Sequence, residues 1–536
     1  MAEALGAAMG RTLDMGKPGA QGAHGGRGEL VAMVDRPTNP SENAEVPSRH
    51  LPFRTAVAKM RPTPERQGPV SHALHSRTID SMDFASINPA TGREEARFDT
   101  HDSDAVEAAL VAAHAARLEW RFVHVSEKAA RLRSVGRLLR ERKDDFGALM
   151  TLEMGKPISQ AVAEAEKCAG LCDYYAEHAE QQLRPVAAAT DASRSYWTYR
   201  PLGIVLGIMP WNFPFWQAIR FAVPAMTAGN SAILKHAPSV PQCALALEKL
   251  FLDAGYPSGV FTNLFVDVET TGLLIDDPRV RAVSLTGSVG AGRSVAARAG
   301  AAIKKCVLEL GGSDPSIVLA DADLDAAATS CATGRLINTG QSCVAAKRFV
   351  VVESVRESFE QKVQDAIAAW VVGDPSEAGT GVGPMARIDL RDALHEQVRR
   401  SVDAGARLVV GGDIPDRPGA WYPPTILADV RPGMAAYDEE LFGPVASILP
   451  AADEADAIRI ANDTAFGLGA SIYTSDVDRG ERIAAELLDA GNCFVNGIVK
   501  SDPRLPFGGT KESGYGRELS PLGILEFTNA KTVWVK

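Results

Sequence analysis

The feature that most constrains the fold of this chain is an alternation of short apolar runs with helical stretches that begins near residue 203. The apolar runs occupy residues 204–209, 232–235, 261–266 and 283–286, and helices are expected after Pro214 and from Val240. Strands that alternate with helices in this way form a parallel sheet covered by helices. The pattern therefore predicts an α/β fold with a wound parallel sheet.

The same alternation resumes further along the chain, which predicts a second α/β unit. Strands are expected at 316–319, 348–352, 407–410, 442–448, 471–473 and 493–496, and helices at 324–336, 354–371, 388–404 and 455–461. Upstream of the first unit, apolar spacing predicts helices from Asp102, from Ser126 as an N-cap, and over 158–182. Residues 195–200 alternate like an exposed strand, and residues 532–536 form a β-type end.

Composition and charge exclude several classes of function. The 536 residues carry a net charge of −11, whereas nucleic-acid or membrane-surface binding needs a basic face. No apolar run approaches the ~20 residues of a membrane helix. Seven cysteines, an odd number, suit a reducing compartment, so we expect a cytoplasmic protein. The ten histidines form no recognised metal motif, and no metal site is expected.

Residues 1–81 differ in composition from the rest of the chain. They are rich in Gly, Ala, Pro, Arg and Ser and lack sustained apolar periodicity, which predicts a disordered N-terminal extension. The stretch has no apolar segment typical of a secretory signal. Met82 directly precedes the segment in which periodic structure begins, so an upstream start-site artefact is an alternative explanation.

Three polar residues are candidates for chemistry. Cys343 ends the small polar stretch 338–343, and a reactive cysteine needs surroundings that stabilise its thiolate. Glu309 interrupts an apolar run before two glycines, where burial would raise its pKa and suit it to act as a general base. Asn212, set among aromatics and prolines, could donate hydrogen bonds to an oxyanion. Taken singly, each also fits a structural role as a buried thiol, a capped strand-end carboxylate or a turn residue.

Together with their flanking motifs, these residues resemble the aldehyde dehydrogenase superfamily in identity, order and spacing. The motifs are Asn88-Pro89-Ala90-Thr91-Gly92, Pro210-Trp211-Asn212-Phe213-Pro214, Thr286-Gly287-Ser288, Glu309-Leu310-Gly311-Gly312, Gly340-Gln341-Ser342-Cys343, Glu439-Glu440-Leu441-Phe442-Gly443-Pro444, Pro506-Phe507-Gly508-Gly509 and Lys531-Thr532-Val533-Trp534. Within the superfamily, residues 235–238, 310–315, 345–349 and 513–520 look most like bacterial NADP-dependent succinate-semialdehyde dehydrogenases.

The resemblance implies an aldehyde dehydrogenase fold. It consists of a Rossmann-like cofactor domain, an α/β catalytic domain and a small β oligomerisation element. We expect the cofactor domain at 82–312, the catalytic domain at 313–520 and an oligomerisation tail at 521–536, with strand 195–200 joining the tail. The expected assembly is a homodimer or homotetramer.

The resemblance also implies a mechanism. Cys343 would attack the aldehyde carbon to form a thiohemiacetal, whose oxyanion the Asn212 amide and the Cys343 N–H would hold. Glu309 would activate the water that hydrolyses the resulting thioester. The residues expected at the cofactor are Trp211, Lys235, Gly287, Ser288, Gly292, Glu440 and Phe442. Pro238 stands where NAD-selective relatives carry a Glu, which favours NADP, with NAD as the alternative.

Substrate choice is expected to depend on Arg220 and Ser501, which match an arginine and a serine that bind the far carboxylate in succinate-semialdehyde dehydrogenases. A structural ion pair is the alternative for Arg220. Ile337 replaces a second arginine of some relatives, and Ala345 excludes the adjacent cysteine of a redox switch. Alternative functions are a broad-specificity short-chain aldehyde dehydrogenase, CoA-dependent acyl transfer, and a non-catalytic structural protein on the same fold.

Overall fold

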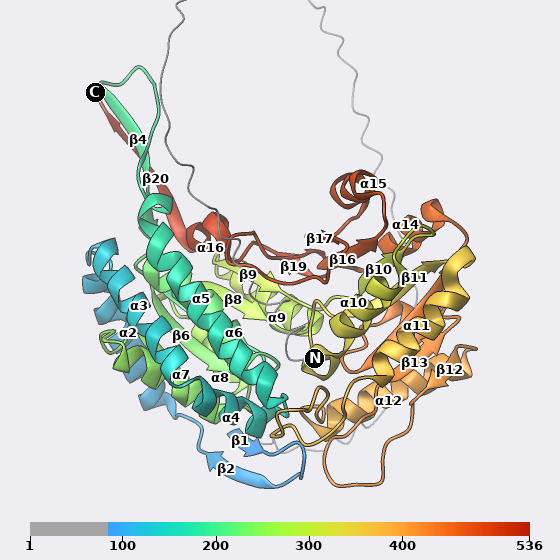
Figure 1. Ribbon diagram of the computed structural model, residues 1–536. Helices are drawn as coiled ribbons and strands as arrows, with labels where there is room; N and C mark the ends of the chain where they lie inside the picture. Colours follow the sequence, from blue (N-terminus) through green and yellow to red (C-terminus); the bar gives the residue numbers. More distant parts are fainter. Residues whose placement is uncertain (1–83) are drawn as a thin grey trace, which may run out of the picture. The chain divides into compact units, whose positions relative to one another are not determined.

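The computed structural model describes residues 84–536. The expectations for the extension at 1–81 lie outside the described residues. Within them, strands and helices alternate as the sequence predicts, and the α/β class is confirmed (Figure 1). No helix in this part of the chain is both long enough and apolar enough to cross a bilayer.

The first large sheet has six strands in the order β19-β9-β8-β5-β6-β7. Its strands are β5 (Ile204–Met209), β6 (Ser231–His236), β7 (Phe261–Asn263), β8 (Val280–Thr286), β9 (Lys305–Glu309) and β19 (Gly514–Tyr515). All neighbours are parallel except β19, which runs antiparallel to β9 and pairs Gly514 with Glu309. The chain therefore returns from beyond residue 500 to the edge of the sheet that carries Glu309.

The second large sheet has seven strands in the order β12-β13-β14-β11-β10-β16-β17. Its strands are β10 (Asp314–Val318), β11 (Ala346–Val352), β12 (Arg407–Val410), β13 (Thr425–Ala428), β14 (Val445–Ala451), β16 (Gly469–Tyr473) and β17 (Asn492–Val495). Only β12 is antiparallel to its neighbour. Both sheets thus have the parallel pairing expected of strands joined by helices.

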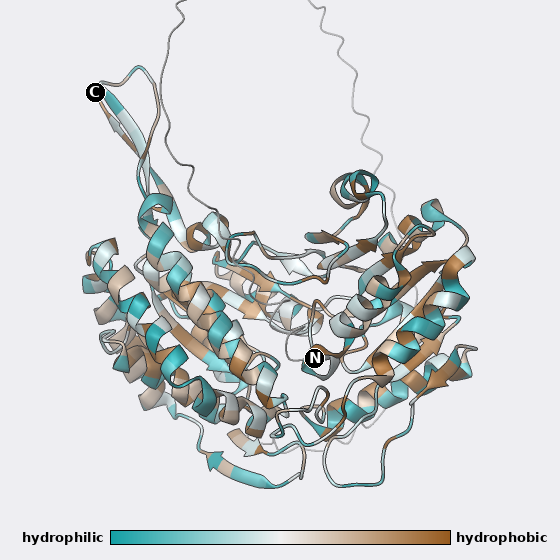
Figure 2. Ribbon diagram, in the orientation of Figure 1, coloured by the Kyte–Doolittle hydropathy of each residue, from teal (hydrophilic) through white to brown (hydrophobic). Residues whose placement is uncertain are grey.

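Helices flank both sheets. Those before or around the first sheet are α2 (Ser103–Trp120), α3 (Val125–Glu141), α4 (Lys143–Met154), α5 (Ile158–Gln182), α6 (Pro214–Thr227), α7 (Pro241–Asp253), α8 (Val268–Asp276) and α9 (Val289–Ala301). Those that follow are α10 (Leu324–Leu336), α11 (Arg356–Ala368), α12 (Ile388–Asp403), α13 (Ala435–Asp438), α14 (Glu454–Asn462), α15 (Val477–Arg482) and α16 (Ser520–Glu526), with short turns η1 (Ile337–Gly340), η2 (Glu353–Val355) and η3 (Ile483–Leu487). Apolar residues concentrate in the strands, and hydrophilic residues lie on outer helix faces (Figure 2).

Three smaller sheets complete the described residues. A three-stranded antiparallel sheet joins β3 (Val186–Ala187), β4 (Arg194–Pro201) and β20 (Thr528–Val535). The pairs β1 (Phe84–Ile87) with β2 (Glu94–Phe98) and β15 (Phe466–Gly467) with β18 (Thr510–Lys511) are antiparallel. The strand predicted at 195–200 and the β-type tail are both present, and they pair with each other. The strand is half-buried rather than exposed, because β20 and β3 lie against it on both edges.

Several sequence expectations need correction. The second helix is capped by His124, whose ring nitrogen accepts from the Ser126 N–H, so Ser126 is not the N-cap. Helix α4 was not anticipated because it follows α3 directly, and the two read as one periodic segment. The run 261–266 forms a strand only as far as Asn263.

Helix α6 is the element that carries site residues deepest into the core. Every one of its residues is buried, which is typical of a helix enclosed on all sides. It lies close against β5, because a Cβ at Gly207 would come within 2.2 Å of the Phe221 ring. Arg220 therefore points into a protein interior and requires a buried polar partner.

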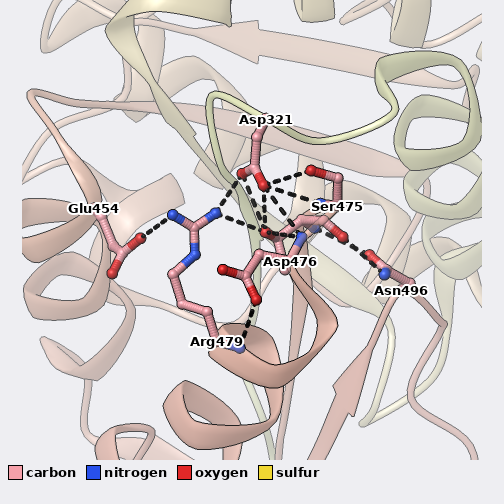
Figure 3. Close-up of polar contacts among 7 residues, drawn as sticks. Asp321, Glu454, Ser475, Asp476, Arg479 and Asn496 are labelled. Carbon is pink, nitrogen blue, oxygen red and sulfur yellow. Dashed lines mark hydrogen bonds and ion pairs between the residues drawn. The ribbon is translucent and has the colours of Figure 1, made fainter.

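A polar junction ties the end of β10 to the loop before α15 (Figure 3). Asp321 accepts hydrogen bonds from the Ser475 hydroxyl at 2.7 Å, from the Asp476 N–H at 3.2 Å and from Arg479 Nη2 at 2.6 Å. Its carboxylate therefore joins two segments that are about 150 residues apart in the sequence.

Candidate functional site

The loop that carries Cys343 has a strained backbone. Asn338, Thr339 and Gly340 are consecutive left-handed residues, with φ of 58°, 53° and 72°. Such a conformation costs roughly 1–2 kcal/mol for a non-glycine residue. The loop is held by hydrogen bonds from the Asn338 N–H to Gln160 Oε1 at 2.7 Å and from Arg335 to the Gly340 carbonyl. These contacts determine where the following cysteine lies.

Asn212 is fastened to this loop from the opposite side. Its Nδ2 donates to the Gln341 carbonyl at 3.1 Å, and Asn338 Nδ2 donates to the Asn212 carbonyl at 2.8 Å. The Asn212 side chain is buried. The predicted amide donor and the predicted nucleophile are therefore brought together, with one N–H of Asn212 Nδ2 still available.

Cys343 is partly buried and sits beside two cations. Burial raises the pKa of its thiol to about 11, while the charges of Arg220 and Lys347 act in the opposite direction. The resting residue is therefore a thiol at neutral pH, and its attack on a carbonyl requires a base.

Glu309 has the properties of such a base. It is buried at the end of β9, and neither carboxyl oxygen has a hydrogen-bond partner among residues 84–536. Burial, and next the charge of Glu518, raise the pKa of Glu309 well above its ordinary value. Gly508 gives the carboxyl room, because a Cβ there would lie 2.8 Å from Glu309 Oε1.

Arg220 forms a buried ion pair with Glu518. Its Nη2 donates to Thr286 Oγ1 at 3.3 Å, and its guanidinium lies 4.8 Å from the centroid of the Phe507 ring. The ion pair given as the alternative role for Arg220 is therefore present, but its carboxylate, Glu518, is buried rather than at the surface. The positive charge of Arg220 also acts to lower the pKa of both Cys343 and Glu309, so it belongs to the same site.

The residues expected at the nicotinamide end of a cofactor also come together. Glu440 accepts from the Gly312 N–H at 3.1 Å and pairs with Lys347 Nζ at 3.1 Å. Lys347 further donates to the Cys343 carbonyl at 2.7 Å. The Trp211 and Phe442 rings meet edge to face, with centroids 5.8 Å apart. One buried lysine thus connects the nucleophile loop with the candidate ribose-binding carboxylate.

The glycine turn lies next to Glu309. The Gly287 N–H donates to the Glu309 main-chain carbonyl at 3.0 Å, and Ser288 caps α9, its Oγ accepting from the Ala291 N–H at 3.3 Å. Gly292 is required by close packing, since a Cβ would come within 2.4 Å of Leu310. The N-terminal end of a helix favours negative charge, so this end suits a phosphate.

The residues around Lys235 have properties that suit the 2′-phosphate of an NADP adenosine. Lys235 is buried on β6, forms no ion pair within residues 84–536, and has a pKa lowered by burial to about 8. The Ser239 hydroxyl, four residues on, is buried and has no hydrogen-bond partner in the part of the chain that the structure describes. Pro238 contributes no carboxylate to repel a phosphate. These residues fit NADP. The described part of the chain holds no cluster of His, Cys, Asp or Glu suited to a metal ion.

Ser501 lies at a second polar contact, where its Oγ accepts from Lys167 Nζ at 2.7 Å. The sequence motifs assign no role to three charged residues of this region, Lys167, Lys347 and Glu518. Lys347 and Glu518 stand inside the motifs 345–349 and 513–520, which were recognised without a role for either residue. Lys167 is one charged residue on a long helix, and no local signal distinguishes it.

Comparison with known proteins matches this arrangement to one family. The model of the Aldehyde dehydrogenase family matches residues 77–533. The chain is 48% identical over 454 residues to a probable succinate-semialdehyde dehydrogenase [NADP(+)] of Synechocystis sp., covering 85% of this chain and all of that protein. It is also 48% identical to the succinate semialdehyde dehydrogenase [NAD(P)+] Sad of Escherichia coli, covering 84% of this chain and 97% of Sad.

Solved structures agree with the sequence comparison. The succinic semialdehyde dehydrogenase of Streptococcus pyogenes, solved in complex with NADP+, superposes with a TM-score of 0.83 at 37% identity. The match covers 84% of this chain and 99% of that one. The fold class inferred from the motifs is thereby confirmed.

Proposed function

The chain belongs to the aldehyde dehydrogenase family, and we propose that it oxidises succinate semialdehyde to succinate with NADP as the hydride acceptor. The observation that supports this chemistry is the buried Glu309 carboxyl, which has no hydrogen-bond partner among residues 84–536. Arg220 acts on the pKa of both Glu309 and Cys343, which supports a single site for the two. Asn212 is hydrogen-bonded to the strained loop that carries the cysteine. A carboxyl group without partners is costly in a protein interior unless it has a function.

In the first step Glu309 accepts the proton of the Cys343 thiol, and the sulfur attacks the aldehyde carbon. The available N–H of Asn212 Nδ2 and the backbone N–H of Cys343 hold the oxyanion of the thiohemiacetal. When bound, the nicotinamide supplies the hydride acceptor.

In the second step the acyl group remains on Cys343 as a thioester. Once the thiol proton has passed from Glu309 to solvent, the Glu309 carboxylate takes a proton from water, and the oxygen of that water attacks the thioester carbon. The acid leaves, and the proton on Glu309 passes to the departing Cys343 thiolate to restore the thiol. Because burial raises the pKa of Glu309, its ionised form is a stronger base than an exposed glutamate.

For the cofactor, we assign Lys235, Ser288 and the α9 turn at Gly287 and Gly292 to the phosphates and adenosine ribose. Glu440 would hold the nicotinamide ribose, with Trp211 and Phe442 beside the ring. Lys235 without a carboxylate partner supports NADP over NAD. The relative from Synechocystis sp. is named as an NADP(+) enzyme and the Escherichia coli relative Sad as an NAD(P)+ enzyme.

For the substrate, we assign Arg220 and Ser501 to the end that bears the distal carboxylate. Arg220 is buried next to the reacting groups, and Ser501 is held by a cation. Both residues lie next to α5, because helix α6, which carries Arg220, packs against α5, and Lys167 of α5 donates to Ser501.

A panel of aldehydes with NADP and NAD measured side by side tests the proposal. Succinate semialdehyde should have a higher kcat/KM than butanal, which has the same carbon chain without the carboxylate. Replacing Arg220 with Met should lower kcat/KM for succinate semialdehyde by roughly 10- to 100-fold, since a charge-assisted hydrogen bond is lost. Equal rates on both aldehydes in the wild type would favour the broad-specificity alternative.

Two further outcomes address the remaining alternatives. A requirement for CoA in product release would indicate acyl transfer and would make Glu309 dispensable. Labelling of Cys343 by thiol reagents without turnover of any aldehyde would support the non-catalytic structural protein.

We also propose that the protein forms a homodimer or homotetramer through the three-stranded sheet. Strands β4 and β20 lie side by side at the C-terminus (Figure 1). They pair over eight residues, and Trp534 and Val535 of β20 are exposed apolar side chains. An exposed sheet edge favours pairing with a second chain. Light scattering on the wild type and on a chain truncated before β20 tests this, and a monomeric wild type would contradict it.

The seven cysteines, all free thiols, support a cytoplasmic location. Cell fractionation tests this assignment. The division into domains at residues 312 and 520 stays a prediction.

A further inference from the structure

Lys167 is a residue of helix α5, which packs against helix α6 (Figure 1). Its Nζ donates to Ser501 Oγ at 2.7 Å and lies 4.2 Å from the centroid of the Trp216 ring. Trp216 and Arg220 are four residues apart on α6 and therefore share a face of that helix. Lys167, Ser501 and Arg220 thus border one region.

The charge balance distinguishes Lys167 from its neighbours. Three cations around the nucleophile loop and α6 have carboxylate partners, which are Glu164 for Lys156, Glu518 for Arg220 and Glu440 for Lys347. A fourth, Arg335, donates to the Gly340 carbonyl of the loop itself. Lys167 forms no ion pair within residues 84–536, and its hydrogen-bond acceptor is a neutral hydroxyl. The region therefore carries an excess positive charge that an anionic ligand would balance.

The hydroxyl of Ser501 adds a second donor. Because its oxygen accepts the bond from Lys167, its own hydrogen remains available for donation. A carboxylate placed here would receive one charged and one neutral hydrogen bond. Arg220 already pairs with Glu518, so a ligand carboxylate would compete with Glu518 for the guanidinium. At Lys167 it would meet no competing carboxylate from residues 84–536.

We propose that Lys167 is a further specificity-determining residue, which binds the distal carboxylate of the substrate beside Arg220, with Ser501 orienting its ammonium group. This inference rests on the proposed function and identifies a second cation that separates a carboxylate-bearing aldehyde from a neutral one. Arg220 divides its charge between Glu518 and the substrate carboxylate, whereas Lys167 has no ion-pair partner among residues 84–536.

The test compares Lys167→Met, which keeps much of the apolar stem, with Lys167→Arg, which keeps the charge. With saturating NADP, Lys167→Met should lower kcat/KM for succinate semialdehyde by roughly 10- to 100-fold, mainly through KM. Butanal should change by no more than about twofold, which also shows that the variant is folded. Lys167→Arg should restore most of the loss. Equal losses on both aldehydes, or no loss on succinate semialdehyde, would overturn the proposal.

A second measurement separates this proposal from the proposed function. The wild-type preference between the two aldehydes tests the substrate assignment alone. Succinate, the dicarboxylate product, should inhibit butanal oxidation by the wild type and inhibit Lys167→Met roughly 10- to 100-fold more weakly. An unchanged inhibition constant would refute the role of Lys167 whichever aldehyde the enzyme prefers.

The pH dependence gives a readout that a packing role would not change. Burial, and next the like charge of Arg220, lower the pKa of Lys167 to about 8. The other ionisable groups that act on it are Glu164, Lys156 and Cys168. The ratio of KM for succinate semialdehyde to KM for butanal should therefore rise above pH 8 in the wild type and stay flat in Lys167→Arg, because arginine remains protonated. A flat wild-type ratio would contradict the proposal.

Discussion

Asp321 and Glu309 are both carboxylates at the ends of elements in a parallel-sheet fold, but their surroundings are opposite. Burial alone would raise the pKa of Asp321, yet hydrogen bonds from Ser475 and Thr474 and the charge of Arg479 outweigh it and lower the pKa (Figure 3). Glu309 is more deeply buried and receives no hydrogen bond on its carboxyl oxygens from the described residues, so its pKa is raised.

The difference separates a structural carboxylate from a reactive one. Asp321 is stabilised as an anion, so it holds its segments together and has little tendency to accept a proton. Glu309 gains by accepting a proton, which is what a general base must do. Removing the first should affect stability, and removing the second should affect turnover.

The largest effect should come from the group on which Glu309 acts. Cys343→Ala should reduce dehydrogenase turnover by roughly 10⁴-fold or more, because no nucleophile remains to form the thiohemiacetal. NADP binding, measured by fluorescence titration, should be retained. Appreciable turnover would remove Cys343 from the mechanism.

Glu309→Gln should lower steady-state turnover by roughly 10²- to 10³-fold, since the amide cannot take a proton from water. Thioester hydrolysis should slow more than hydride transfer, so stopped-flow absorbance should show a burst of one NADPH per active site. Asp321→Asn is the matched control and should turn over at the wild-type rate. If both variants lost activity equally, the contrast between the two carboxylates would fail.

Asp321→Asn should destabilise the fold by roughly 1–3 kcal/mol, because the charge-assisted hydrogen bonds are lost and the amide NH2 group faces other hydrogen-bond donors. Chemical denaturation measures this change. Glu454→Gln is the control, since Glu454 makes an exposed contact of 3.4 Å with the same Arg479 and should change stability by less than about 1 kcal/mol. Similar losses in the two variants would show that the junction is an ordinary surface network.

The pH dependence of these stability changes should have opposite signs. The lowered pKa of Asp321 gives stability that is present above its unfolded pKa and is lost as pH falls through the folded value, so Asp321→Asn should approach the wild type in acid. The raised pKa of Glu309 gives stability that is lost as pH rises through the folded value, so Glu309→Gln should become the more stable protein at alkaline pH. Unfolding curves measured across pH test both signs, and the same sign in both variants would contradict the comparison.

Much of the fold was predictable because its signals are local. The strands at Ile204–Met209 and Arg407–Val410 and the helices at Ile158–Gln182 and Leu324–Leu336 match the expected bounds, since apolar periodicity reflects neighbouring residues on one face. The boundary between α3 and α4 was missed because a turn between two consecutive helices interrupts the periodicity only briefly.

Local sequence signals likewise predicted the reactive residues of the candidate site but not their contacts. The motifs identified Asn212, Glu309 and Cys343 along the chain. In the structure Asn212 is hydrogen-bonded to Gln341 of the cysteine loop, and the Gly287 N–H donates to the Glu309 main-chain carbonyl. The charge of Arg220 acts on the pKa of Glu309. The motifs contained no information on which carboxylate would pair with Arg220. The ion pair given as the alternative role for this residue is a buried one with Glu518.

By itself, the sequence determined the α/β class, the order of strands and helices and the residues able to perform thiol and carboxyl chemistry, because these depend on residue type and short-range spacing. Only the tertiary structure decided that, among residues 84–536, the Glu309 carboxyl would lack hydrogen-bond partners, that Asp321 would have several, and that Lys167 would lie against Ser501. The reason is physical: hydrogen bonds and burial depend on side chains that lie hundreds of residues apart in the sequence, and no local pattern records which of them meet.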